Sequence, residues 1–240
     1  MKQNEKILII FDVDKTITNE DSLDVISKYL LTSEQKLQFQ QNVTDEMIWV
    51  DSLNYFYELS KSNGKNIFSI KKALEKVNLT EGMIDLFSFL RKNKKIFDSI
   101  IISGGNKFSV NYLIKYHNLD DVIKEQYANQ SEIKDDMLYI SKAHEHNCDI
   151  CDPSICKKKE LDNFFEKYPK NQYNKIVYIC DGYNDLCLVR YLQKNDYLFL
   201  RKYYDLYNTL YVDGVDFKIN CKCCPWRDGK EIIRKIKKII

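Results

Sequence analysis

The chain has 240 residues, of which 44% are hydrophobic, so it is long enough for one large domain or for a core with a smaller insertion. Its 37 basic and 35 acidic residues nearly balance, which argues against nucleic acid or a membrane surface as partners. The sequence does not open with the basic, apolar and small-residue succession of a secretion signal, and we expect a cytoplasmic protein that is a monomer or a homodimer.

The first predicted element is a buried strand, KILIIF, at residues 6–11. The stretch FDVDKTIT overlaps its end and places Asp12 and Asp14 two residues apart. Two carboxylates this close repel each other unless a cation or a shared proton relieves them. Ligands of open α/β sheets bind beyond the carboxyl ends of the strands, so the pair lies where a bound cation is expected.

The rest of the chain alternates between helical and strand patterns. Two further apolar runs, DSIIIS at residues 98–103 and KIVYIC at residues 175–180, indicate buried parallel strands. The closing KEIIRKIKKII has the spacing of an amphipathic helix. Four segments before the second strand also carry apolar residues at helical spacing: residues 21–31, 47–61, 67–77 and 80–93.

Strands that alternate with helices predict an α/β fold with a doubly wound, Rossmann-like parallel sheet. The interval between the first and second strands is long enough for an inserted, all-helical cap. We therefore expect the cap at residues 17–95. The catalytic core would comprise residues 1–16 and 96–240.

Polar residues end the other two strands as well. Ser103 precedes Gly104 and a second glycine, and CDGYND places Asp181 and Asp185 after the third strand. Three or four carboxylates around a hard cation suit Mg²⁺, which prefers oxygen ligands and keeps waters that a phosphate can replace. Thr16, Ser103 and Gly104 offer a hydroxyl or backbone N–H groups to phosphate oxygens. The pattern favours phosphoryl chemistry at this edge.

A cationic side chain should neutralise a transferring phosphoryl group. Lys157, Lys158 and Lys159, at the start of a predicted helix before the third strand, are the candidates. With them, the sequence resembles the haloacid dehalogenase-like phosphatases, because FDVDKTIT, IISGG, the Lys157 region and YICDGYND are similar to the four motifs of that superfamily in the same order. Dehalogenases lack the second acid of the first motif, so Asp14 indicates phosphoryl transfer.

Longer segments resemble one branch of this superfamily, the eukaryotic phosphoethanolamine/phosphocholine phosphatases and pyridoxal-phosphate phosphatases. The similarity is carried by LTEGMIDLFSFLRKNKKIFDSIIIS, HEHNCDICDPSICKKKEL and YICDGYNDLCLVRYL, and it runs nearly end to end. The C-x2-C-x4-C-K segment is its most specific part. This segment identifies Lys157 as the phosphate-binding lysine of the three.

The resemblance implies a division of chemical roles. Asp12 would be the nucleophile and would form an aspartyl-phosphate. Asp14 would protonate the leaving oxygen and then deprotonate the attacking water. Mg²⁺ would lie on Asp12, on the backbone carbonyl of Asp14 and on Asp181, with Asp185 supporting the metal shell.

The same resemblance assigns the phosphoryl oxygens to three residues, Thr16, Ser103 and Lys157, beside the backbone N–H that Gly104 offers. The resemblance does not extend to the substrate-binding residues, because the relatives carry acids at two such positions where this chain has Leu23 and Gly104. The SGG form and NEDSLD, with Asp21, are instead similar to phosphoserine phosphatase.

A carboxylate-bearing substrate calls for an Arg, and residues 17–90 contain none, whereas they do contain several acids and aromatic residues. Acids and aromatics suit an ammonium or choline head group. We therefore expect a small phosphomonoester as substrate, with phosphoethanolamine or phosphocholine first, pyridoxal phosphate second and phosphoserine third.

The cysteines suggest a second metal. Cys148, Cys151 and Cys156, together with His144 or His146, have a spacing compatible with structural zinc. Cys180 and Cys187 are expected to be packing residues, and a further group at residues 221–224 has no assigned role. A non-catalytic, zinc-organised binding protein is the alternative of another class. The acid Asp14 argues against it, because a binding module does not need an acid/base group.

Overall fold

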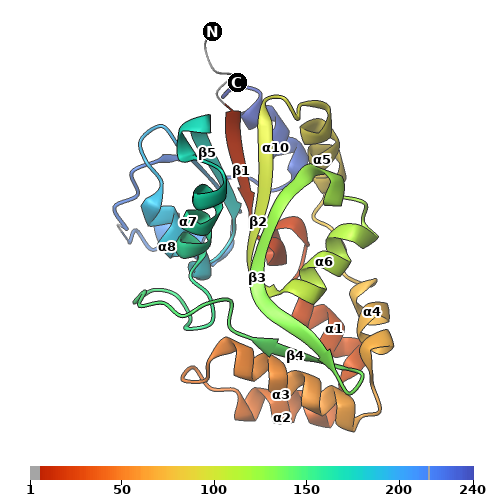
Figure 1. Ribbon diagram of the computed structural model, residues 1–240. Coiled ribbons are helices and arrows are strands. Elements are labelled where there is room, and N and C mark those ends of the chain that lie inside the picture. The colour runs from red at the N-terminus through yellow and green to blue at the C-terminus, as the bar shows by residue number, and fades with distance from the viewer. Residues whose placement is uncertain (1–5, 216) are drawn as a thin grey trace.

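The computed structural model describes residues 6–215 and 217–240. Residues 1–5 and 216, which fall in the predicted core ranges, lie outside the described residues. In the described part, seven strands form one sheet in the order β4-β3-β2-β1-β5-β6-β7 (Figure 1). Only β4 runs antiparallel to its neighbour. The strands are β1 (Lys6–Phe11), β2 (Phe97–Asn106), β3 (Ile123–Lys134), β4 (Met137–Ser141), β5 (Tyr173–Cys180), β6 (Tyr197–Leu200) and β7 (Lys222–Cys223).

Helices cover both faces of this sheet because its central strands are apolar on both sides. Alternate residues of a strand point to opposite faces, and in β1 Ile9 belongs to one buried cluster while Ile10 belongs to another. The first cluster includes side chains of α5 (Met83–Lys92), α6 (Lys107–Tyr116) and α10 (Gly229–Ile236). The second includes side chains of α7 (Lys157–Lys167), α8 (Leu186–Tyr191) and α9 (Asp205–Tyr211). The predicted doubly wound α/β core is thus confirmed.

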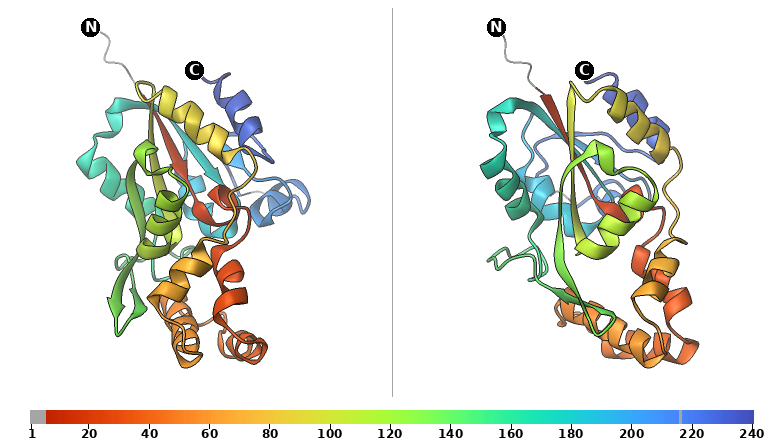
Figure 2. Two further views of the ribbon diagram at one scale, coloured as in Figure 1. Left: turned by 90° about the vertical axis from the view of Figure 1, so that its right-hand side faces the viewer. Right: turned by 45° about the vertical axis from the view of Figure 1, so that its right-hand side comes forward.

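Four helices form a second body beyond the carboxyl end of the sheet (Figures 1 and 2). A separate buried cluster holds this cap together. It also includes Leu138 and Ile140 of β4, which lies along α3. The Asn54 side chain fixes that contact by donating to the Ile140 carbonyl and accepting from its N–H, each at 2.8 Å. The four helices are α1 (Ser22–Leu30), α2 (Ser33–Asn42), α3 (Trp49–Ser62) and α4 (Ile67–Leu74).

The packing bears on where the cap ends. The chain enters and leaves the cap side by side, with Thr18 and Leu79 in an antiparallel bridge. The predicted cap range 17–95 includes α5, yet Phe87 of α5 stacks on Phe11 of β1 with ring centroids 5.2 Å apart. We therefore propose a cap that ends near Leu79, with α5 belonging to the core.

The observed elements agree with most of those predicted from the sequence. All three predicted strands are present, as β1, β2 and β5, and the six predicted helices correspond to α1, α3, α4, α5, α7 and α10. No helix within residues 6–215 and 217–240 is long and apolar enough to cross a membrane.

Candidate active site

The carboxyl ends of β2, β1 and β5, which are neighbours in the sheet, bring the predicted site residues together. A pocket of about 320 Å³ opens here between core and cap, a volume at the lower end of the range for small-molecule sites. Six of the predicted residues line it: Asp12, Asp14, Asp21, Ser103, Gly104 and Lys157. Asp181 and Asp185 lie directly behind, since one carboxylate oxygen from each and one from Asp12 fall within 4.8 Å of one another.

Lys157 is the central charged group of this site. Its side chain is only 2% exposed, and its Nζ donates to Asp12 Oδ1 at 2.6 Å and to Asp185 Oδ1 at 2.5 Å. Burial alone would lower the pKa of Lys157, but the charges of the two carboxylates raise it above its ordinary value. Lys157 is therefore a permanent cation that fixes Asp12 against Asp185.

Asp185 is also held by its own neighbours. Its Oδ1 accepts from the Tyr178 hydroxyl, and its Oδ2 accepts from the Gly182 N–H at 3.1 Å. With Lys157, three donors thus surround one fully buried carboxylate. This arrangement makes Asp185 the anchor of the lysine.

One lysine does not balance three buried carboxylates. Burial raises the pKa of Asp12 to about 6, although the charge of Lys157 offsets part of this effect. Burial and then the charges of Asp12 and Asp185 raise the pKa of Asp181 to about 9. Because the donors are carboxylate oxygens with excess negative charge, they fit a hard cation such as Mg²⁺.

Asp14 occupies a different environment on the cap side of the same pocket. Its Oδ1 accepts from the N–H of Ser22, the first residue of α1, at 2.7 Å. Burial and then the charge of Asp21 raise the pKa of Asp14 to about 7. The two acids of FDVDKTIT therefore differ in their partners, because Asp12 accepts from a lysine whereas no lysine of residues 6–215 and 217–240 donates to Asp14.

The turn that follows Asp14 is held by an arginine that no sequence motif marks. Lys15 has a left-handed backbone with φ of 54°, which strains a residue with a side chain. The buried Arg201 donates to the Lys15 carbonyl at 2.5 Å and to the Asn19 carbonyl at 3.1 Å. These bonds stabilise the loop that presents Asp14 to the pocket.

The Ser103 loop brings backbone close to the pocket. The Ser103 hydroxyl accepts from the N–H of Gly105 at 3.0 Å, and a Cβ on Gly105 would come within 3.3 Å of that oxygen. The buried Asn129, also missed from the sequence, donates to the Gly104 carbonyl at 2.9 Å and accepts from the Ala143 N–H. No sequence motif marks Asn129, because it acts from the neighbouring strand β3.

Thr16 is placed differently from the other predicted phosphate ligands. It is fully buried and does not line the pocket; its hydroxyl donates to Asp181 Oδ1 at 3.4 Å. Thr16 therefore contacts a carboxylate of the cation site in this structure.

The cap and one loop supply the outer part of the pocket, where a head group would lie. Asp21 and Leu23 come from the start of the cap, and Trp49 and Tyr57 come from α3. Asp152 reaches in from the loop after β4, and its Oδ2 accepts from the Trp49 N–H at 3.0 Å. Lys157 is the only basic residue among the lining residues in the described chain.

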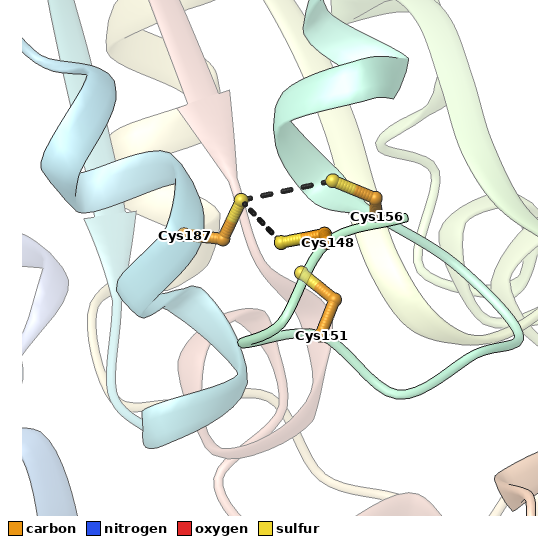
Figure 3. A group of neighbouring side chains, drawn as sticks. All are labelled: Cys148, Cys151, Cys156 and Cys187. Atoms are coloured by element: carbon orange, nitrogen blue, oxygen red, sulfur yellow. Dashed lines mark hydrogen bonds between the residues drawn. The ribbon is translucent and has the colours of Figure 1, made fainter. Parts of the chain in front are cut away.

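The predicted zinc ligands are brought together only in part. The sulfurs of Cys148, Cys151 and Cys156 converge, but the fourth member of the group is Cys187 of α8, which was expected to be a packing residue (Figure 3). The residues Cys221, Cys223 and Cys224 belong to no such group in the part of the chain that the structure describes.

The two histidines of the zinc prediction are engaged elsewhere. The ring nitrogens of His144 contact Glu160 Oε1 at 2.8 Å and the Cys156 N–H at 3.1 Å. Those of His146 contact the Asp152 carbonyl at 3.0 Å and the Cys148 N–H at 3.1 Å. Because both nitrogens of each ring already have partners, the prediction of a histidine ligand is corrected.

Comparison with known proteins places this geometry in a family. A family model described as Putative Phosphatase matches residues 7–240. The chain belongs to this phosphatase family. It is a phosphoric monoester hydrolase, as the resemblance of its motifs implied.

Two curated relatives match this chain over nearly its whole length. Pyridoxal phosphate phosphatase PHOSPHO2 of Bos taurus is 31% identical over 240 residues, covering 98% of this chain and 99% of its own length. Phosphoethanolamine/phosphocholine phosphatase of Gallus gallus is 25% identical, covering 98% of this chain and 89% of its own length. These two relatives are thus named for different substrates.

Solved structures agree in fold. A phosphoserine phosphatase described as a phospho-aspartyl intermediate analogue is similar with a TM-score of 0.62, at 20% identity, over 96% of this chain and 99% of its own. The hydrolase YfnB of Bacillus subtilis, described as bound to magnesium, is similar with a TM-score of 0.52, at 18% identity, over 97% of this chain and 99% of its own.

The excess of negative charge among the buried carboxylates can be tested by measuring the free energy of unfolding at different pH values. The folded state binds the Asp181 proton more tightly than the unfolded state does, because the pKa is raised to about 9 from 3.8. As the pH rises from about 4 to about 9, Asp181 ionises in the unfolded state but keeps its proton in the folded state, so the fold loses stability, and Asp181→Asn removes this effect. In urea unfolding with a chelator, the free energy of unfolding of the variant relative to wild type should increase by more than about 1.4 kcal/mol between pH 5 and pH 8.

The control is Asp135→Asn, which makes the same change at a side chain that is 89% exposed. This variant should follow the wild-type pH dependence, and saturating Mg²⁺ should reverse the advantage of Asp181→Asn because a metal ligand is then missing. Parallel pH profiles for wild type and Asp181→Asn would contradict the charge excess.

Proposed function

We propose that the enzyme is a Mg²⁺-dependent phosphatase of small phosphomonoesters and that it acts through an aspartyl-phosphate on Asp12. The observation that carries this proposal is the pairing in one pocket of Asp12, held by the buried Lys157, with Asp14, an acid of raised pKa. A nucleophile that must stay ionised and an acid that must carry a proton need such unlike environments.

In the first step, an Asp12 oxygen forms a bond to phosphorus and the bond to the ester oxygen breaks. Asp14 gives its proton to that leaving oxygen, so the alcohol departs neutral. Lys157, Ser103 and the backbone of the loop at Gly104 and Gly105 face the pocket, where they can hold the phosphoryl oxygens.

In the second step, water attacks the phosphorus of the aspartyl-phosphate. Asp14, now ionised, takes a proton from this water, and the bond between phosphorus and the Asp12 oxygen breaks. Inorganic phosphate leaves, and both acids return to their starting states. Asp12, Asp181 and the backbone carbonyl of Asp14 would hold Mg²⁺, which when bound offsets negative charge on the phosphoryl group.

The direct test is release of inorganic phosphate from phosphoethanolamine, phosphocholine, pyridoxal phosphate, phosphoserine and pyrophosphate in the presence of Mg²⁺. Asp12→Asn keeps the size of the side chain but removes the nucleophile, so it should abolish turnover, including turnover of a generic aryl phosphate. Surviving activity in this variant would contradict the mechanism. Normal urea unfolding of the variant would show that the loss is chemical.

The acid role of Asp14 predicts a dependence on pH and on the leaving group. Because the pKa of Asp14 is raised to about 7, its protonated fraction falls as the pH rises above that value. For an alkyl phosphate, kcat/KM should therefore fall above about pH 7, and Asp14→Asn should lower it by at least about 100-fold. For p-nitrophenyl phosphate, whose leaving group needs little protonation, both effects should be smaller. Equal losses with the two substrates would contradict an acid role.

The outer pocket favours a cationic head group. The carboxylates of Asp21 and Asp152 line it together with the aromatic Trp49, and the only basic residue in the described lining is Lys157, which is already paired. A phosphoserine carboxylate would find no arginine there, whereas an ammonium group would find both acids and an aromatic face. We therefore propose phosphoethanolamine or phosphocholine as substrate.

Pyridoxal phosphate is the second candidate. It is favoured by the 31% identity to a pyridoxal phosphate phosphatase over nearly the full length. Leu23, Trp49 and Tyr57 also give the outer pocket an apolar and aromatic surface on which a pyridine ring could stack.

Asp21→Asn tests the preference for a cationic head group. If Asp21 pairs with an ammonium group, the variant should lower kcat/KM for phosphoethanolamine about tenfold, or about 1.4 kcal/mol, and leave neutral propyl phosphate nearly unchanged. The assay is best run at pH 6, because Asp21 also raises the pKa of Asp14. Asp24→Asn, one turn on and exposed, is the matched control. Equal effects on both substrates would argue against the cationic head group.

A further inference from the structure

Four cysteines from three parts of the chain meet beside the active site. Cys148 and Cys151 lie on the irregular loop after β4, Cys156 is the residue before α7, and Cys187 is on α8. Figure 3 shows their sulfurs turned toward a common centre. Cys156 is buried and the other three are half-buried, so the group lies inside the protein but near its surface.

We propose that these four thiols bind one structural Zn²⁺ ion. Zinc in structural sites is held by four ligands at the corners of a tetrahedron with Zn–S bonds of about 2.3 Å, which corresponds to sulfurs about 3.8 Å apart. The sulfur of Cys187 lies 3.5 Å from that of Cys148 and 3.6 Å from that of Cys156. All four sulfurs lie within 4.8 Å of one another. Little movement would be needed to enclose an ion.

The surroundings favour metal binding over the other roles of such a cluster. All four are free thiols. The sulfur of Cys187 is almost equally distant from those of Cys148 and Cys156, as expected for ligands that share one ion, whereas a disulfide would bring it close to only one of them. The backbone N–H groups of Ile150 and Cys151 interact with the Cys148 sulfur, an arrangement that stabilises a negatively charged ligand. The nearby histidines are already bonded, so the site has sulfur ligands alone.

The choice of metal follows from ligand softness. Thiolates select zinc and other soft or borderline metals, whereas Mg²⁺ requires oxygen. The two metal-compatible groups of the described chain thus differ in kind, because one holds four sulfurs and the other the carboxylates of Asp12, Asp181 and Asp185. Each should take its own ion.

Zinc at this place would brace the active site. Cys156 is covalently next to Lys157, and Cys187 is two residues after Asp185, the anchor of that lysine. The same loop carries Asp152, which contacts Trp49 at the start of α3 in the cap. One ion would therefore fix a loop without helix or strand to α8 and so hold its contacts with both the lysine and the cap.

The test measures metal directly. Protein purified under reducing conditions is analysed for zinc, then stripped and titrated with Co²⁺ in excess Mg²⁺, which keeps the carboxylate site occupied. We expect one zinc per chain and a thiolate-to-cobalt charge-transfer band, which oxygen ligands cannot produce. Cys148→Ser and Cys187→Ser should weaken Zn²⁺ binding by well over tenfold, because loss of even an outer-shell partner typically costs about 10–100-fold.

Cys224→Ser is the control, since Cys224 is half-buried and outside the group, and this variant should bind zinc as wild type does. Failure of the reduced wild-type chain to bind zinc, or cobalt binding without a thiolate band, would overturn the proposal. Both readouts use wild-type protein, so they hold if a variant fails to fold. They are also independent of phosphatase activity.

Discussion

The active site depends on one buried lysine that is outnumbered by carboxylates. Lys157 bonds to Asp12 and Asp185 with almost no exposure to solvent, and such a pair is maintained only when its geometry and further hydrogen bonds offset the loss of water. Tyr178 and Gly182 supply those bonds to Asp185. The chain can therefore orient Asp12, the proposed nucleophile, without a metal, but it leaves a negative excess around Asp181 that would repel a phosphate until a cation binds.

The cap has a chemical role beyond covering the pocket. It supplies both Ser22, whose N–H bonds to Asp14, and Asp21, whose charge helps to raise the pKa of that acid. The proton affinity of Asp14 thus depends on the position of α1. If the cap moves away, water reaches Asp14 and the effect of the Asp21 charge weakens. These two changes lower the pKa of Asp14 and outweigh the loss of the Ser22 N–H, which favours the ionised form, so the acid loses its proton more easily. Cap closure and proton donation are in this way linked.

The sequence predicted the core of this site well and its supports poorly. The apolar runs and the acids that follow them identified β1, β2, β5 and the residues at their ends, because strand burial and strand-end polarity are local patterns. Arg201, Asn129 and Tyr178 carry no such pattern. Arg201 is more than a hundred residues away from the carbonyl groups to which it donates. Asn129 and Tyr178 lie inside ordinary strands, so only the folded chain shows what they contact.

The cysteine group shows the same limit. C-x2-C-x4-C is visible as a motif, and the sequence then suggested a neighbouring histidine as the fourth ligand. The fold instead brings Cys187 across from α8, 31 residues after Cys156, while the backbone N–H groups within the loop and Glu160 of α7 engage the two histidines. Short spacing could reveal three ligands, but the fourth depended on how α7 and α8 pack.

The carboxylate group and the cysteine group are suited to different tasks. In the proposed mechanism, the cation at the carboxylates exchanges oxygen ligands at each turnover, which suits a labile, hydrated ion. The thiols adjoin Lys157 and Asp185 in sequence but do not face the phosphate pocket as a group, and a closed sulfur site holds its ion without exchange. With the proposed zinc bound, the lysine would stay fixed while the proposed Mg²⁺ site beside it exchanges its oxygen ligands.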